Sequence, residues 1–150
     1  MLSSAYITML QSCTPNGWSF MYAIRETMLA YEGGFPLMFA EVVPSDITLL
    51  AESAILSTFR QSISFFELDE QDSLGLNLTD STQPNYIIQK TKMDSAERAM
   101  HAFIFALNEY EDIILSSIRA VPTPRYLWNG GKVLVGVDLT ITITTPPERC

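Results

Sequence analysis

The strongest constraint on the fold is a stretch near the end of the sequence, residues 132–145, which reads KVLVGVDLTITITT. Aliphatic side chains occupy every second position, and small or hydroxyl residues fill most positions between them. Because successive side chains of a strand point to opposite faces, this alternation produces one aliphatic face and one mostly hydroxyl face. β-Branched residues also fit a pleated sheet better than a helix. The stretch therefore predicts a long, half-buried antiparallel strand, with these residues on its aliphatic face: Val133, Val135, Val137, Leu139, Ile141 and Ile143.

The length of 150 residues predicts a single domain, 1–150, with a substantial core. Hydrophobic residues make up 47% of the chain and charged residues 17%, which indicates a globular protein rather than a disordered one. The low charged fraction and the mean hydropathy of +0.15 favour an oligomer whose subunits cover part of each other's apolar surface. A monomer with a large core is the alternative.

The net charge is −8, and the densest basic cluster is the pair Lys90 and Lys92. Phosphate binding requires a concentrated positive surface, so we expect no sequence-specific binding of nucleic acid. No apolar run approaches the roughly 18 residues that a membrane helix needs. The first residues lack the features of a signal peptide, so we expect the chain to stay in the cytoplasm or in a particle assembled there. Cys13 and Cys150 are accordingly expected to be free thiols.

The order of expected elements is a helix, two or three strands, a long helix and a final hairpin. The sequence leaves three points open. Ile47–Leu56 can be either a linker or a helical turn, and the prolines at 122 and 124 can either interrupt a strand or border it. The long helix can start either near Tyr86 or at an Asp94–Glu97 capping pair. The expected ranges are helices at 2–11, 25–31 and within 85–110, strands at 18–24, 35–43, 57–68, from 113 and at 132–145, a hairpin turn at 129–131, a long acidic loop at 67–84 and a short tail at 146–150.

These elements predict an α+β fold. One mainly antiparallel sheet, ending in a long C-terminal hairpin, is packed on one face by a long helix and an N-terminal helix. The long helix carries an apolar stripe at spacings of three and four, formed by Met93, Ala96, Met100, Phe103, Ile104 and Leu107.

No set of residues in the sequence predicts catalysis. The only histidine, His101, lies beside the apolar stripe of the long helix, and nothing in the sequence points to partners for a triad or a metal site. A histidine at the edge of the core or on the surface is the better interpretation. Phosphate-binding glycine loops and paired cysteine or histidine motifs do not occur. We therefore expect neither an enzyme nor a bound cofactor or metal.

One acidic run stands out, formed by Glu67, Asp69, Glu70 and Asp72. A calcium loop would need an earlier glycine than Gly75 and a later bidentate glutamate, so a solvated loop is the simpler interpretation. A third interpretation is a negative surface that faces a channel or a neighbouring subunit.

Phe65 and Phe66 must point to opposite faces of one strand, so one of the two rings leaves the main core. Phe66 is therefore a candidate subunit contact. The other phenylalanines in this set are assigned to the core: Phe35, Phe39, Phe59, Phe103 and Phe105.

Four stretches in this order resemble small virion proteins of tailed bacteriophages. They are FPLMFAEVVP (35–44), FFELDEQDS (65–73), YIIQKTKMDSAERAMHAFIFALN (86–108) and LWNGGKVLVGVDLTITITTP (127–146). The layout is similar to that of tail terminators and of neck-ring, or head–tail connector, proteins. The resemblance covers the chain from Phe35 onward and rests on patterns rather than on a catalytic signature.

The resemblance implies a structural virion protein that forms a ring of six or twelve copies at the tail–neck junction and lets DNA pass. Its partners would be further copies of itself and other phage neck or tail proteins. A net charge of −8 fits a channel that repels DNA phosphates, and the acidic run would face the channel or a neighbouring ring. The alternatives are another tail, baseplate or capsid subunit, and a non-viral α+β domain that binds a small ligand.

Overall fold

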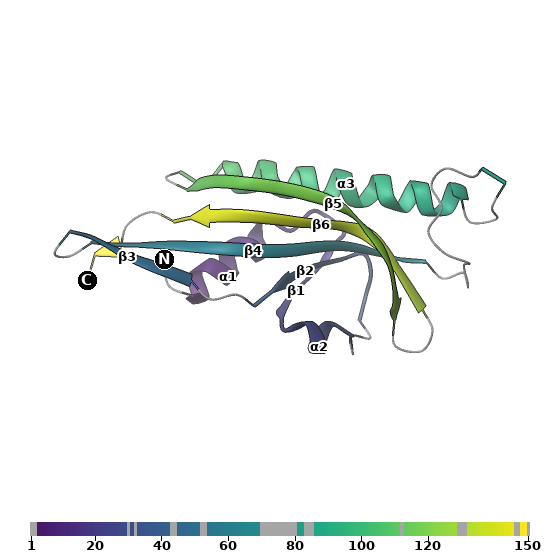
Figure 1. Ribbon diagram of the computed structural model, residues 1–150, viewed down its shortest axis with the longest axis horizontal. Helices are drawn as coiled ribbons and strands as arrows, with labels where there is room; N and C mark the ends of the chain where they lie inside the picture. Colours follow the sequence, from purple (N-terminus) through teal and green to yellow (C-terminus); the bar gives the residue numbers. More distant parts are fainter. Residues whose placement is uncertain are drawn as a thin grey trace.

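The structure, a computed structural model, describes residues 3–29, 31, 33–42, 45–51, 54–69, 81–82, 86–111, 113–128, 132–145 and 148–149 (Figure 1). The elements are α1 Ser3–Ser12, β1 Ser19–Ala23, α2 Arg25–Leu29, β2 Leu37–Glu41, β3 Ser45–Ala51, β4 Ala54–Asp69, α3 Tyr86–Asn108, β5 Ile114–Trp128, β6 Lys132–Thr144 and β7 Glu148–Arg149.

One sheet organises the molecule, in the strand order β1-β2-β4-β6-β5, with β3 and β7 also paired to β4. The β1–β2 pair is parallel, and all the other pairs are antiparallel. The central pair of β4 and β6 extends from Thr58 opposite Thr144 to Asp69 opposite Val133. The long strand expected from the alternation at 132–145 is therefore confirmed, and it lies inside the sheet between β4 and β5.

The main core lies between one face of this sheet and the two helices α1 and α3. The odd-numbered residues of β6 from Val135 to Ile143 are buried there, together with Phe59, Ile63 and Phe65 of β4. Figure 1 shows α3 running alongside the long strands β5 and β6. All but one of the six residues of its predicted stripe are buried, Ile104 being half-buried. The predicted α+β architecture is thus confirmed.

A buried glutamine connects α1 to the sheet. The Tyr6 hydroxyl donates a hydrogen bond of 2.7 Å to Oε1 of Gln61, and the Tyr6 ring stacks on Phe59. Nε2 of Gln61 donates to the backbone oxygens of Glu41 and Ser62. The amide therefore satisfies both of its polar atoms inside the core, as a buried polar group must. Burial, with a smaller contribution from Tyr22, raises the pKa of the Tyr6 hydroxyl.

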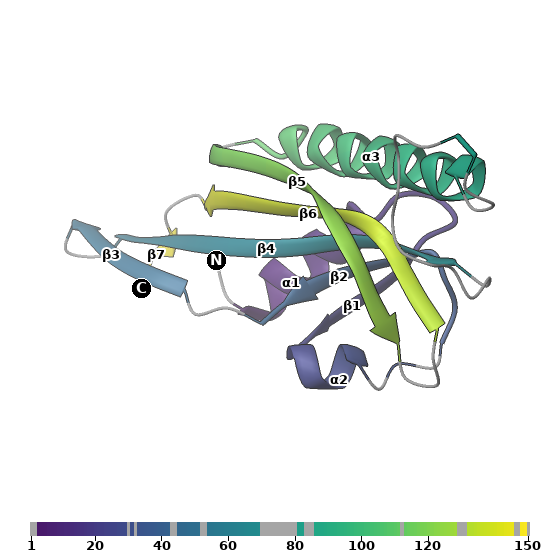
Figure 2. The same cartoon turned by 45° about the vertical axis from the view of Figure 1, so that its right-hand side comes forward.

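A second, smaller core lies on the opposite face of the sheet. It contains Met28 of α2, Leu37 and Phe39 of β2, Phe66 of β4 and Leu134 of β6. Figure 2 shows α2 beside β1 and β2, away from α3. The short helix therefore covers one end of this face, and no other element among the described residues covers the rest of it, which we call the uncovered face.

Three sequence predictions differ from the structure in detail. Ile47–Leu56 is neither a linker nor a helical turn, because β3 and the start of β4 form a hairpin there. This hairpin projects past the end of β6 (Figures 1 and 2). Strand β5 does not end at Pro122 or Pro124, although its pairing with β6 is interrupted between Thr123 and Tyr126, around Pro124. An edge strand tolerates prolines because one side of its backbone needs no partner. The expected tail includes the two-residue strand β7, paired to Ala54 and Ile55. The long helix starts at Tyr86 rather than at the Asp94–Glu97 pair, which confirms the first of its two alternatives.

Candidate interaction surfaces

The predicted acidic loop starts later than expected. Glu67 and Asp69 are the last residues of the long central strand β4, whereas Glu70 and Asp72 lie outside the described residues. Strand β4 continues because both residues pair with β6, at Val135 and Val133. The described part of the structure therefore brings no more than two of the four predicted acids onto one element.

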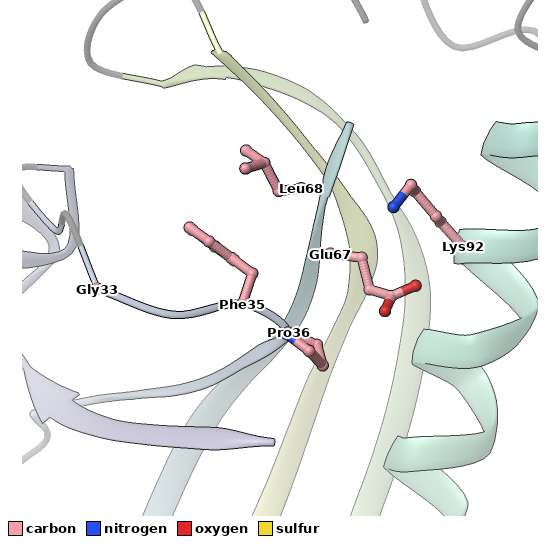
Figure 3. A pocket seen from close by; sticks show the side chains of 6 residues that line it. All are labelled: Gly33, Phe35, Pro36, Glu67, Leu68 and Lys92. Carbon is pink, nitrogen blue, oxygen red and sulfur yellow. The ribbon is translucent and has the colours of Figure 1, made fainter. Parts of the chain in front are cut away.

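Glu67 lines a shallow hollow of about 240 Å³ between the end of β4 and α3. Figure 3 shows its carboxylate directed toward α3, and Lys92 reaching out from that helix above Phe35 and Pro36. The volume lies below the roughly 300 Å³ at which pockets for small ligands begin. The hollow is therefore a poor candidate for a ligand site, and Glu67 is half-buried rather than fully solvated.

Two phenylalanines differ from their predicted positions. The ring of Phe66 leaves the main core, as predicted, but it is 0% exposed in the second core, so the folded chain leaves none of it for a subunit contact. Phe105 was assigned to the core and is 74% exposed. It lies two residues after the fully buried Phe103, which places it on the far side of the helix. Phe105, and not Phe66, is therefore the ring that is accessible at the surface.

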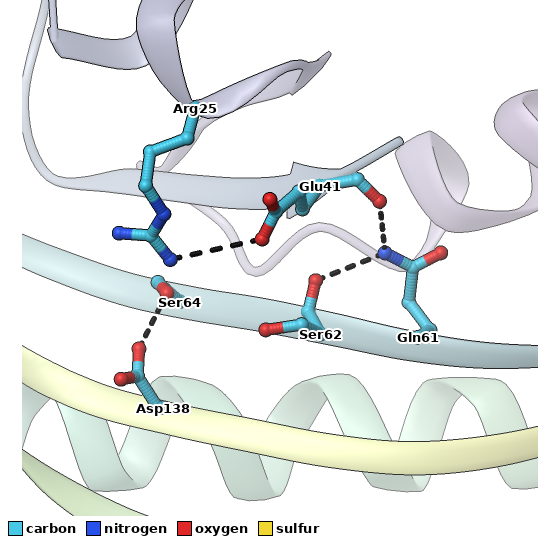
Figure 4. Close-up of polar contacts among 6 residues, drawn as sticks. All are labelled: Arg25, Glu41, Gln61, Ser62, Ser64 and Asp138. Atoms are coloured by element: carbon cyan, nitrogen blue, oxygen red, sulfur yellow. Dashed lines mark hydrogen bonds and ion pairs between the residues drawn. The ribbon is translucent and has the colours of Figure 1, made fainter. Parts of the chain in front are cut away.

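The uncovered sheet face is polar, and its side chains form cross-strand rows. Ser64 donates a hydrogen bond to the Asp138 carboxylate opposite it, and the Thr58 and Thr144 hydroxyls lie 3.5 Å apart. Figure 4 shows the Ser64–Asp138 bond. Next to it are the hydrogen bonds of Gln61 and an ion pair of 3.7 Å between Arg25 of α2 and Glu41 of β2. The complete rows between β4 and β6 are Thr58–Thr144, Arg60–Thr142, Ser62–Thr140 and Ser64–Asp138.

Strand β5 forms an edge of the sheet and carries large apolar side chains in water. Ile114 is 61% exposed, Ile118 50% and Val121 42%. A bulge between Ser116 and Arg119, with Ser117 at φ 51°, interrupts the pairing with β6. Bulges and prolines protect an edge from indiscriminate strand addition. Contacts through β5 are therefore expected to use its side chains rather than a continuous new strand.

The C-terminal ends of α1 and α3 meet at a second polar region. Here the Ser12 and Tyr110 hydroxyls share a hydrogen bond, and a hollow of about 440 Å³ opens beside them, with Glu109 and Glu111 in its wall. Neither helix has a basic residue in its last turn. Cys13 also lines this hollow as a buried free thiol, and burial raises its pKa. We call the region formed by Ser12, Glu109, Tyr110 and Glu111 the acidic helix end.

The described residues contain no group of three or more histidine, cysteine, aspartate or glutamate side chains placed to hold a metal ion. His101 is exposed on α3, in agreement with the surface interpretation. Within the same described residues, no helix is long and apolar enough to cross a membrane.

Comparisons with known proteins identify no family. No protein-family model matches the sequence, and no curated protein is significantly similar to it.

Sequence reasoning placed Arg60 on the polar face of its strand, but it missed Arg119 beside it on that face and it missed the acidic helix end. The alternation along β4 and β6 indicated a polar face, but only the strand register places Arg60 and Arg119 on either side of β6. The acidic helix end joins Ser12 to Tyr110, which are 98 positions apart in the sequence.

Proposed function

We propose that this chain is a structural virion protein of a tailed bacteriophage, which forms a ring at the tail–neck junction as a tail terminator or connector ring. The sequence resemblance suggests this role. The observation that carries the proposal is an uncovered sheet face bordered by an edge strand with three exposed aliphatic side chains, Ile114, Ile118 and Val121.

Exposed apolar groups at one place on a protein surface commonly mark a site of association. All three side chains lie within eight residues of one strand. A contact that repeats head to tail closes into a ring when the rotation between neighbours allows it. The acidic composition, with a net charge of −8, suits a ring through which DNA slides, because carboxylates repel phosphates.

The first test locates the chain in purified phage particles by cryo-electron microscopy. The expected result is a sixfold or twelvefold ring of this chain at the head–tail junction. Absence of the chain from the particle would refute the proposal. Light scattering of the purified protein, alone and with tail tubes, provides a second measure, with an expected mass near six or twelve times the 16.8 kDa of one chain.

A second experiment tests the acidic segment as part of the channel. Replacing Glu67, Asp69, Glu70 and Asp72 by Gln or Asn is expected to preserve the ring and to slow DNA passage, because uncharged walls repel phosphates less. Neutralising Asp94 and Glu97 on α3 provides a control with similar chemistry. If DNA ejection from particles carrying the fourfold variant proceeds at the wild-type rate, the segment does not line the channel.

A further inference from the structure

We propose that neighbouring copies contact one another through two specific surfaces: the uncovered face of β4, β6 and β5 in one copy binds the acidic helix end of the next copy. This inference rests on the proposed ring function and identifies the surfaces that build the ring.

The uncovered face carries a positive charge without a partner. Arg60 of β4 lies opposite Thr142, and Arg119 of β5 lies opposite Thr140, so the two arginines flank β6 on the same face. Both side chains are exposed, and neither has an ion-pair partner within the described parts of the chain. Two described carboxylates on this face are already engaged, since Asp138 accepts a bond from Ser64 and Glu41 pairs with Arg25.

The acidic helix end carries the complementary charge. Glu109 and Glu111 are both exposed and follow directly on the last turn of α3. The C-terminus of a helix is the negative end of its dipole, and cations stabilise it. Two helices end here without a basic residue in their last turns, so the negative potential has no local compensation from them. Arginine is the residue best suited to such a site, because its planar guanidinium binds carboxylates through paired hydrogen bonds.

Apolar groups accompany the charges on both surfaces. Ile114 lies opposite Thr144 and Val121 lies opposite Asp138, which places them on the same face as the arginines. On the other surface Tyr110 is 39% exposed beside the glutamates. Tyrosine and arginine are enriched in protein interfaces, where a buried apolar centre with paired charges at its border is the common arrangement.

The position of the two surfaces decides the type of contact. The arginines lie on the face opposite to α1 and α3, whereas the acidic helix end belongs to those helices. The two surfaces therefore cannot meet within one chain. A contact between them is heterologous and leaves both partners with one free surface, which allows the arrangement to continue around a closed ring.

Charge reversal on each surface provides the test. Variant A carries Arg60→Glu and Arg119→Glu, and variant B carries Glu109→Arg and Glu111→Arg. Either variant alone places like charges on both of its surfaces, so self-association measured by analytical ultracentrifugation or light scattering is expected to weaken by at least about 100-fold. In an equimolar mixture, the acidic face of A meets the basic end of B, and the basic face of B meets the acidic end of A. The mixture is expected to recover rings in which A and B alternate.

Arg98→Glu, at an exposed position elsewhere on α3, serves as the matched control and is expected to associate like the wild type. Circular dichroism and melting curves establish that each variant folds. Rings of variant A or B alone would overturn this inference and leave the ring function standing, as would a mixture that stays dissociated although both variants fold. The inference would also be overturned if the wild-type chain bound a different virion protein through the uncovered face. Absence of the chain from the particle would overturn both the inference and the ring function.

Discussion

Gly136 lies where the backbones of β6 and β4 approach closely, and replacing it with alanine tests the packing of the sheet directly. A Cβ atom at this position would overlap the carbonyl oxygen of Phe65 and lie 2.8 Å from its carbonyl carbon and 3.1 Å from Cα of Phe66. All three atoms belong to the backbone of β4, so no side-chain rotation relieves the overlap. The strands must separate or twist, and β4 pairs with four other strands.

The expected cost follows from these contacts. Overpacking a core costs about 1–3 kcal/mol, and the upper end applies here because rigid backbone must move. The lower chain entropy of unfolded alanine returns about 0.4–1 kcal/mol. Gly136→Ala is therefore expected to lower the free energy of unfolding by roughly 2 kcal/mol or more. For a chain of this size that corresponds to a fall in Tm of about 4–8 °C.

Urea unfolding monitored by tryptophan fluorescence measures this loss. Gly34→Ala is the matched control, because a Cβ there meets only the Ser19 hydroxyl oxygen at 3.6 Å, an ordinary contact. The control is expected to be neutral or slightly stabilising. Equal stability of Gly136→Ala and Gly34→Ala would refute the close approach of β4 and β6.

The remaining predictions concern three buried residues, Tyr6, Phe66 and Cys13. Tyr6→Phe leaves Oε1 of Gln61 without its donor and is expected to cost about 1–3 kcal/mol in urea unfolding; a loss under 0.5 kcal/mol would mean that the bond contributes little. Burial raises the pKa of the Tyr6 hydroxyl, so above about pH 10 the folded chain keeps the hydroxyl proton while the unfolded chain loses it. The free energy of unfolding of the wild type is therefore expected to fall with rising pH, relative to Tyr6→Phe, by up to about 1.4 kcal/mol per pH unit. Phe66→Ala is expected to lower the free energy of unfolding by about 3–5 kcal/mol at any protein concentration, because the ring is buried within the chain. If the substitution weakened self-association alone and left the stability unchanged, Phe66 would instead be part of a subunit interface. In a Cys150→Ser background, Cys13 is expected to react with a thiol reagent far more slowly in native buffer than in urea, and equal rates would contradict its burial.

Local patterns determined most of the elements. Period-two alternation identified β6 and most of β4, and spacings of three and four identified α3, because each pattern follows from the geometry of the element itself. The prediction was wrong where the outcome depends on a partner. Strand β3 has only a short alternation, at Ile47, Thr48 and Leu49, and its pairing with β4 makes it a strand; β5 passes through two prolines because it is an edge.

The same distinction separates the chemistry of the surfaces. The sequence by itself determined the α+β class, the aliphatic face of β6, the negative charge and the opposite orientation of Phe65 and Phe66, since these depend on composition and on the side-chain period of a strand. Only the tertiary structure decided that α2 buries Phe66, that Phe105 faces water, and that Arg60 and Arg119 share an uncovered face opposite the helices. Strand register and the choice of which helix covers which face are contacts between distant segments, and the pattern within any single segment does not contain them.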